Sequence, residues 1–75
     1  MTINYPAIFA PQKEGGYSVS FPDLPEAITE GDTLAEATAR AAEVLKLTLD
    51  GRRAEGMEIP APSTKVDGAI LVFGK

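Results

Sequence analysis

The sequence predicts a small α+β domain with the element order β-β-β-α-β, in which one helix covers one face of a mixed sheet. Residues 17–21 alternate apolar and serine side chains, which is the period of two typical of a strand. Residues 33–54 repeat apolar side chains at spacings of three and four, as an amphipathic helix does. Residues 69–73 form an apolar run that predicts a last, buried strand. The 75 residues are enough for one domain, which we expect to span residues 1–75.

The first two strands are predicted to form a hairpin. Apolar residues at every second position predict a strand over residues 2–10, followed by a turn that ends in Gly15 and Gly16. Pro6 cannot donate a backbone hydrogen bond, which favours an edge position or a bulge. The second strand, residues 17–21, presents an aromatic and β-branched face opposite a serine face, so we expect one side of the sheet to be covered.

A break in the sheet follows this strand. Two prolines bracket Asp23 and Leu24, and the Asp23 side chain can accept a hydrogen bond from a backbone amide two residues on. Leu24 is either tucked under this loop or exposed as a contact. Residues 27–29 make a short third strand that Gly31 ends.

The helix has recognisable ends. Thr33 and Glu36 fit a capping box at its start, and Gly56 is the predicted cap at its end. Its apolar stripe is formed by Leu34, Ala37, Ala41, Leu45 and Thr48 or Leu49. Val44 and Leu47 lie off this stripe and either widen it or contact a second subunit.

The last part of the chain is predicted to return to the sheet. Residues 58–64 form an extended connector stiffened by prolines. The apolar run at 69–73 suits a strand buried on both faces, placed beside the first strand and parallel to it after a right-handed crossover. The first strand would then be central, which fits poorly with Pro6.

Composition excludes several kinds of site. The chain has no cysteine and no histidine, which removes disulfides, thiolate metal sites and the commonest general base. It has no apolar run long enough to span a membrane and no secretory signal, so we expect a cytoplasmic protein. A domain this small buries little surface, and self-association into a homodimer or larger homo-oligomer would hide what remains.

The charge distribution points to a protein partner. The net charge is −4, which argues against binding of nucleic acid by this chain. No basic residue occurs between Lys13 and Arg40. Six acidic residues do: Glu14, Asp23, Glu26, Glu30, Asp32 and Glu36. This tract is either a solvated face or a surface that attracts a basic partner.

No catalytic site emerges from the sequence. Ser18 and Ser20 have no residue nearby that could activate them as nucleophiles. A two-metal nuclease needs several carboxylates that converge on the metals. Asp23, Glu30 and Asp32 lie instead in predicted loops and at a helix start, so we expect no catalytic residue, no metal ligand and no cofactor.

Most of the chain resembles the HicB family of antitoxins. The resemblance is carried by G-Y-S-V-S-F-P-D-L-P at residues 16–25 together with G-D-T-L-A-E-A at residues 31–37, and it continues to residues 59–63. Each piece alone is weak, but the combination is specific. Residues 26–27 are Glu-Ala where many relatives have a small pair such as Gly-Cys, which affects only the loop.

The resemblance implies a partial ribonuclease H-like fold without catalytic carboxylates. It also implies a partner, the HicA toxin, an mRNA-cleaving ribonuclease whose active site the antitoxin covers. In that case the acidic tract could present carboxylates where the toxin binds phosphates. The side chains that we predict to contact the toxin are Phe21, Asp23, Leu24, Glu26, Glu30, Asp32 and Glu36.

Two other functions remain open at this point. The chain could be a divergent metal-dependent nuclease, or a structural module that forms homo-oligomers. HicB proteins commonly carry a C-terminal DNA-binding module. This sequence stops soon after the last predicted strand, so we expect no DNA-binding domain in it.

Overall fold

A computed structural model describes residues 3–63 and 66–74 of the chain. Thr2 and Thr64, which the sequence predictions assigned to the first strand and to the connector, lie outside the described residues. The elements follow the predicted order. They are β1 (Ile3–Pro11), β2 (Tyr17–Phe21), β3 (Leu24–Gly31), α1 (Leu34–Ala54) and β4 (Ile70–Gly74).

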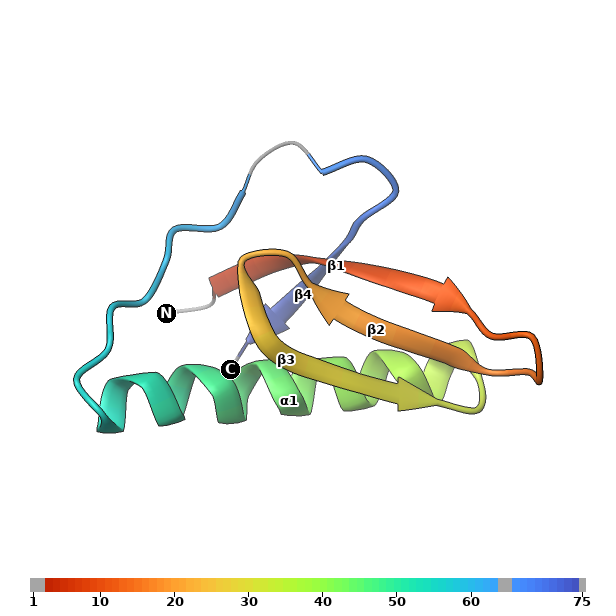
Figure 1. Ribbon diagram of the computed structural model, residues 1–75, viewed down its shortest axis with the longest axis horizontal. Coiled ribbons are helices and arrows are strands. Elements are labelled where there is room, and N and C mark those ends of the chain that lie inside the picture. Colours follow the sequence, from red (N-terminus) through yellow and green to blue (C-terminus); the bar gives the residue numbers. More distant parts are fainter. Residues whose placement is uncertain (1–2, 64–65, 75) are drawn as a thin grey trace.

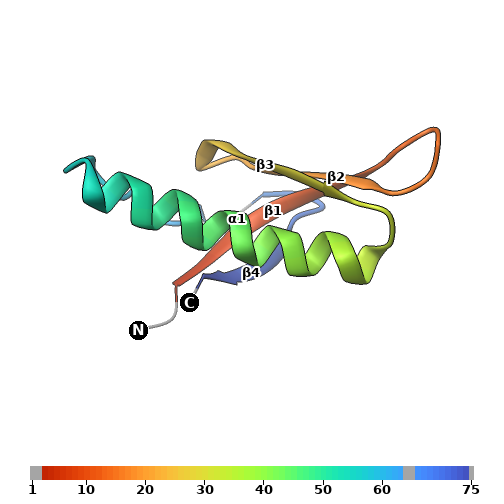
Figure 2. The ribbon, with the colours of Figure 1, turned by 90° about the horizontal axis from the view of Figure 1, so that it is seen from below.

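The four strands form one sheet in the order β3-β2-β1-β4, and α1 lies across one of its faces (Figures 1 and 2). Every neighbouring pair of strands is antiparallel. The α+β class, the single covering helix and the central position of β1 are therefore confirmed. The prediction of a mixed sheet is wrong.

The hairpin between β1 and β2 follows the predicted turn chemistry. Gly15 and Gly16 have φ values of 98° and 81°, which residues with a side chain rarely adopt. The Gln12 amide donates to the Gly16 carbonyl at 2.9 Å and closes the turn. Pro6 lies opposite Leu71, in the half of β1 whose paired residues all belong to β4. Because β2 does not pair with this half of β1, no hydrogen bond to β2 is lost at Pro6.

β3 is longer than predicted. Only Pro22 and Asp23 separate the two strands, and Leu24 already pairs with Phe21. The register then shifts, so that Ser20 pairs with Ile28, and this bulge accommodates Pro25 within the strand. The sequence suggested a break here because prolines are rare in sheets, but β3 is an edge strand and can accept one.

The helix has the predicted ends. Thr33 Oγ1 accepts a hydrogen bond from the Glu36 amide at 3.1 Å. At the other end, the Gly56 amide donates to Arg53 and the Met57 amide donates to Arg52, while Gly56 has a φ of 71°. This pair of bonds around a left-handed glycine is a Schellman motif, so the predicted cap at Gly56 is confirmed.

The core lies between α1 and one face of the sheet. The buried helix residues are Ala37, Ala41, Leu45 and Leu49. They pack with sheet residues from all four strands: Tyr5, Ala7, Val19, Phe21, Leu24, Ala27 and Val72. Leu34, predicted as part of the stripe, is exposed at the helix start, and Leu47 is exposed on the outer side. Val44 is partly buried and widens the stripe.

β4 runs opposite to its predicted direction. A short connection after α1 would start the last strand parallel to β1. Residues 55–69 instead travel back along the sheet before β4 begins, so β4 pairs with β1 antiparallel (Figure 1). The Tyr5 hydroxyl donates to the Pro60 carbonyl and holds this connector against the sheet.

β4 is also less buried than its composition predicted. It is the terminal strand of the sheet, and Val72 alone among residues 70–73 is buried. The expectation of a strand buried on both faces is therefore wrong: Leu71 and Phe73, which alternate with Val72 and lie on the opposite face, are 59% and 55% exposed. No helix in residues 3–63 and 66–74 has the length and apolar content that crossing a membrane requires.

Candidate protein-binding surface

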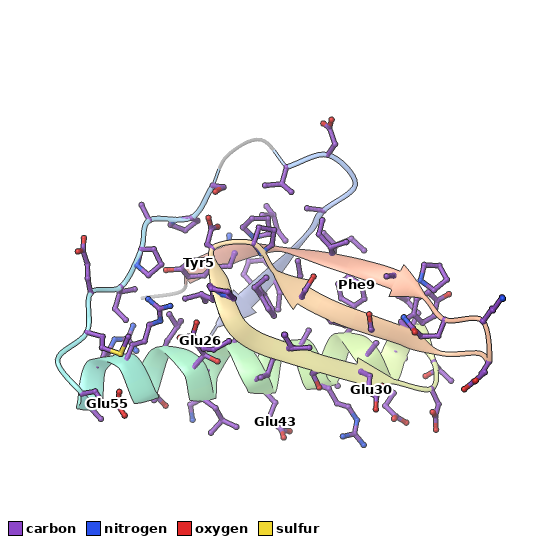
Figure 3. All side chains as sticks on the ribbon, viewed as in Figure 1. Tyr5, Phe9, Glu26, Glu30, Glu43 and Glu55 are labelled. Carbon is purple, nitrogen blue, oxygen red and sulfur yellow. The ribbon has the colours of Figure 1, made fainter. Side chains whose placement is uncertain are left out.

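The acidic residues predicted as contacts fall into two groups. Glu26 lies near the start of β3, close to the second half of α1, and Glu30 lies near the other end of the strand (Figure 3). Asp23 belongs with Glu26, whereas Asp32 and Glu36 belong with Glu30 at the start of the helix. The two groups differ in what their carboxylates contact.

Glu26 forms a bidentate ion pair with Arg52 of α1. The Arg52 Nε and Nη2 atoms donate to the two carboxylate oxygens at 2.6 and 2.8 Å. The hydrogen bond from Arg52 lowers the pKa of Glu26 to about 2, and the same bond raises the pKa of Arg52. Arg52 also donates to the Glu58 carbonyl at 3.2 Å, so it joins β3 to the connector.

Asp23 has a similar role at the β2–β3 turn. Its carboxylate accepts hydrogen bonds from the Ser63 amide, at 2.9 Å, and from the Ser63 hydroxyl. The predicted bond to a backbone amide two residues on cannot form, because residue 25 is a proline and has no N–H. The Asp23 carboxylate contacts the connector instead. Burial raises the pKa of the nearby Tyr5 phenol, and the Asp23 charge adds to that effect. Asp23 and Glu26 thus fasten the connector to the sheet.

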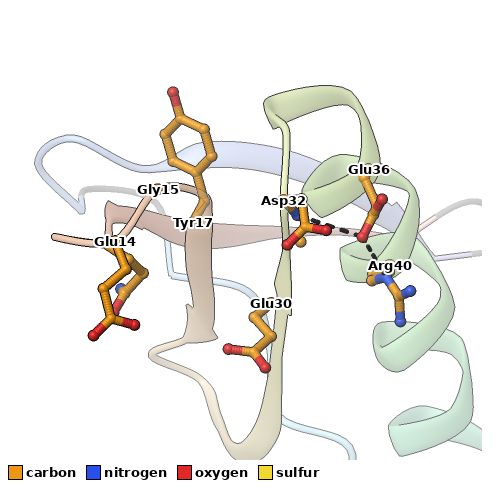
Figure 4. Close-up of a pocket in the computed structure, with 9 residues that line it drawn as sticks. Glu14, Gly15, Tyr17, Glu30, Asp32, Glu36 and Arg40 are labelled. Carbon is orange, nitrogen blue, oxygen red and sulfur yellow. Dashed lines mark hydrogen bonds and ion pairs between the residues drawn. The ribbon is translucent and has the colours of Figure 1, made fainter.

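The second group lines an open depression at the opposite end of β3. The depression has a volume of about 480 Å³ (Figure 4). Its lining residues come from the β1–β2 hairpin, the end of β3 and the first turns of α1: Gln12, Glu14, Gly15, Tyr17, Glu30, Gly31, Asp32, Glu36 and Arg40. We call this region, with its four carboxylates Glu14, Glu30, Asp32 and Glu36, the acidic depression.

Two glycines allow the hairpin, the end of β3 and the start of α1 to pack closely around the acidic depression. A Cβ atom on Gly31 would lie 2.4 Å from the Ala37 nitrogen, so the helix can start against the end of β3 only because residue 31 lacks a side chain. A Cβ atom on Gly16 would lie 2.7 Å from the Gly31 carbonyl oxygen. Strand pairing then sets Ser18 opposite Glu30, which brings the hairpin beside the helix start.

The acidic depression carries an excess of negative charge. It contains four carboxylates and one guanidinium group, that of Arg40. Glu36 Oε1 lies 3.3 Å from Arg40 Nε and accepts a hydrogen bond from the Asp32 amide at 3.4 Å. Glu30 and Asp32 are exposed, and their carboxylates make none of the ion pairs found in the described part of the chain. They can accept hydrogen bonds from Lys or Arg side chains of another molecule.

Two of the predicted contact residues are inaccessible. Phe21 is 1% exposed and Leu24 is 0% exposed, and both belong to the core beneath the β2–β3 turn. The predicted contacts did not include Glu14, although it lies in the acidic tract. The turn composition signalled a hairpin, but only the register of β1, β2 and β3 brings Glu14 to the same depression.

Among residues 3–63 and 66–74, no three acidic side chains come together in a group that could hold a metal ion. The acidic depression is wide, and its carboxylates come from three separate segments of the chain. Its chemistry is that of a surface that accepts hydrogen bonds from cations.

Comparison with known proteins identifies close relatives. Residues 4–73 match the sequence model of the HicB_like antitoxins of bacterial toxin–antitoxin systems. Over 61 residues, the chain is 44% identical to antitoxin HicB of Escherichia coli K12, covering 81% of this chain and 44% of that protein. The chain spans about half, or less, of the length of the curated antitoxins that it matches.

Solved structures share the fold. A chain of a toxin–antitoxin complex from Streptococcus pneumoniae superposes with a TM-score of 0.84 at 23% identity, covering 100% of this chain and 70% of that one. A chain of the HicA3 and HicB3 toxin–antitoxin complex gives a TM-score of 0.73 at 25% identity, covering 97% of this chain and 96% of that one.

Proposed function

Because the chain belongs to the HicB_like antitoxins of bacterial toxin–antitoxin systems, we propose that it binds a HicA-type ribonuclease toxin and neutralises it by covering the active site. The match over residues 4–73 carries this proposal, because it includes nearly the whole chain. The likeness to chains from two toxin–antitoxin complexes, one of them of HicA3 with HicB3, supports it.

The toxin contact in this proposal is the acidic depression. A ribonuclease must attract the phosphates of RNA, and the same positive surface attracts carboxylates. Glu30, Asp32 and Glu36 keep the contact role predicted for them, and Glu14 joins them. The depression accommodates long basic side chains, and its charge excess would speed the encounter with a basic protein.

The other four predicted contact residues have a supporting role in this proposal. Asp23 and Glu26 hold the connector through Ser63 and Arg52. Phe21 and Leu24 fill the core below the turn, so they fix the position of β3 without touching a partner.

A charge-neutralised variant tests the contact surface. The triple variant Glu14→Gln, Glu30→Gln, Asp32→Asn removes three charges without disturbing the capping residues. The matched control is Glu43→Gln, Asp50→Asn, Glu55→Gln, which removes three exposed charges from α1 and its C-cap residue, beyond the acidic depression. We expect the first variant to bind the toxin more weakly, by about tenfold or more, and with a smaller salt dependence than the control. Equal affinities for the two variants would reject the acidic depression as the contact.

We further propose that the chain acts by binding rather than by catalysis, that these residues bind no nucleic acid, and that the protein works in the cytoplasm as a homodimer or larger homo-oligomer. The absence of histidine and the net charge of −4 support the first two points. A ribonuclease assay with Mg²⁺ and Mn²⁺ tests the first. RNA cleavage that disappears in Asp23→Asn or Asp32→Asn would establish a nuclease instead.

A further inference from the structure

Among residues 3–63 and 66–74, no strand pairs with the outer edge of β4. β4 is the terminal strand of the sheet, beside β1. Residues Ile70–Gly74 include no charge and no proline. Three of their side chains are about half exposed: Ile70 at 48%, Leu71 at 59% and Phe73 at 55%. An edge of this kind is a template for pairing with another strand.

The opposite edge of the sheet has the features that prevent such pairing. β3 carries Pro25, which cannot donate to a neighbouring strand, and the charged residues Glu26 and Glu30. A register shift interrupts its pairing with β2 near Phe21. Proline, charge and a bulge are the usual protections of an edge strand. Because β3 has all three and β4 has none, β4 is the edge suited to an interaction.

We propose that β4 pairs antiparallel with β4 of a second copy of this chain, so that the two sheets join across a two-fold axis. Two copies that each carry a net charge of −4 can approach closely only where neither presents charge, and β4 is such a segment. The acidic depression involves β3 and the β1–β2 hairpin, away from this edge. In such a pair both copies use the same strand, so the contact gives a closed dimer and not an open chain of copies. The inference rests on the homo-oligomer proposed above and names its interface.

The alternation of side chains selects the register. Opposite residues of an antiparallel pair lie on the same face, and Leu71 and Phe73 share the face that α1 does not cover. Centring the axis at Val72 pairs all of Ile70–Gly74 and sets Leu71 of each copy opposite Phe73 of the other. An aliphatic side chain opposite an aromatic one is a favourable cross-strand pair.

The exposed area indicates a weak dimer. With roughly 200 Å² for a fully exposed large apolar side chain, the exposed fractions of Ile70, Leu71 and Phe73 sum to about 300 Å² per copy. Two copies can bury at most about 600 Å² of these side chains, which is below the roughly 1,200 Å² at the lower limit of a standard interface. Backbone hydrogen bonds supply part of the affinity in strand pairing. We therefore expect dimerisation that depends on concentration in the micromolar to millimolar range.

Cross-linking tests the register, because the native chain has no cysteine. A mixture of the Leu71→Cys and Phe73→Cys variants should form a disulfide-linked heterodimer under mild oxidation, more readily than either variant alone. The control is Ile28→Cys, on the protected β3 edge, where residue 28 is 65% exposed. If the control links as fast as the mixture, linking reflects random collision and the proposal is wrong.

Sedimentation equilibrium tests the interface without cysteine. Leu71→Lys places a charge on the β4 edge and should lower the association constant about tenfold or more. The matched control Leu47→Lys changes an equally exposed leucine on α1 and should leave association unchanged. Circular dichroism verifies that both variants are folded. A native chain that is monomeric at millimolar concentration, or equal association of both variants, would overturn the proposal. Toxin neutralisation by Leu71→Lys, measured in parallel, separates this failure from failure of the antitoxin function.

Discussion

Replacing Gly31 by alanine should destabilise the domain strongly, whereas the same change at Gly51 should stabilise it. A Cβ atom on Gly31 would lie 2.4 Å and 2.7 Å from the Ala37 nitrogen and Cα, and 2.9 Å from the Glu36 carbonyl carbon. All three are backbone atoms, so no side chain can rotate to relieve the clash. The start of α1 must move away from β3.

The size of the effect follows from these contacts. Overpacking in a well-packed site costs about 1–3 kcal/mol, and an obstacle made of backbone belongs at the upper end of that range. Small domains are stable by about 0.05–0.15 kcal/mol per residue, or roughly 4–11 kcal/mol for a chain of this size. Gly31→Ala therefore removes a large share of the stability. It should also weaken toxin binding, because Gly31 brings Glu30 beside the helix start.

Gly51 provides the matched control. It lies within α1, and a Cβ atom there would meet nothing within 4 Å. Alanine favours the helix over glycine by about 0.5–1 kcal/mol, so Gly51→Ala should stabilise the domain by that amount.

Urea denaturation followed by circular dichroism measures both effects. With a slope of about 1 kcal/mol per M for a domain this small, the midpoint should fall by about 3 M for Gly31→Ala and rise by about 0.5–1 M for Gly51→Ala. A Gly31→Ala midpoint within about 0.5 M of the native value would refute the close approach of α1 to β3.

Three further substitutions test the fold. Glu26→Gln should lower the free energy of unfolding at neutral pH and make it depend less on pH in the acid range. The pKa of Glu26 in the folded chain is about 2, below the usual 4.5. The pair with Arg52 therefore stabilises the fold above pH 4.5, and this stabilisation is lost as the pH falls towards 2. Urea midpoints between those pH values, compared with the native chain, provide the check. Thr33→Ala removes the acceptor for the Glu36 amide and should cost about 1 kcal/mol, and Thr33→Ser should restore the loss in the same assay. Leu45→Ala empties a fully buried site and should cost about 2–5 kcal/mol, so a thermal midpoint unchanged in this variant would contradict the described core.

The sequence was most informative where local chemistry decides the structure. The capping pair Thr33 and Glu36, the turn glycines and the cap at Gly56 depend on neighbours within a few residues, and the structure has all of them. The direction of β4 was predicted wrongly because it depends on the path of residues 55–69, which the contact of Tyr5 with Pro60 helps to fix. No local pattern encodes a contact across that distance.

For the candidate site, too, the sequence predicted what depends on local residues and missed what depends on distant contacts. Charge along the chain identified the acidic tract, but it could not separate the carboxylates that hold the fold from those that face solvent. Glu26 differs from Glu30 because Arg52, 26 residues away along the chain, donates two hydrogen bonds to the Glu26 carboxylate. Phe21 and Leu24 were also predicted as contacts, although the sequence left open whether Leu24 is tucked under the turn or exposed. The structure buries both side chains below a tight turn.

The two proposed surfaces should act independently. The acidic depression lies at the end of β1 that leads into the hairpin, where Pro11 pairs with Tyr17, whereas β4 pairs with the opposite half of β1, from Ile3 to Ala7. Substitutions at sites that share no contacts have additive effects on free energy. A variant that combines the neutralised acidic depression with Leu71→Lys should therefore bind the toxin as weakly as the neutralised variant does. It should self-associate as weakly as the Leu71→Lys variant does. A combined variant whose toxin binding falls well beyond that of the neutralised depression alone would mean that the dimer itself takes part in holding the toxin.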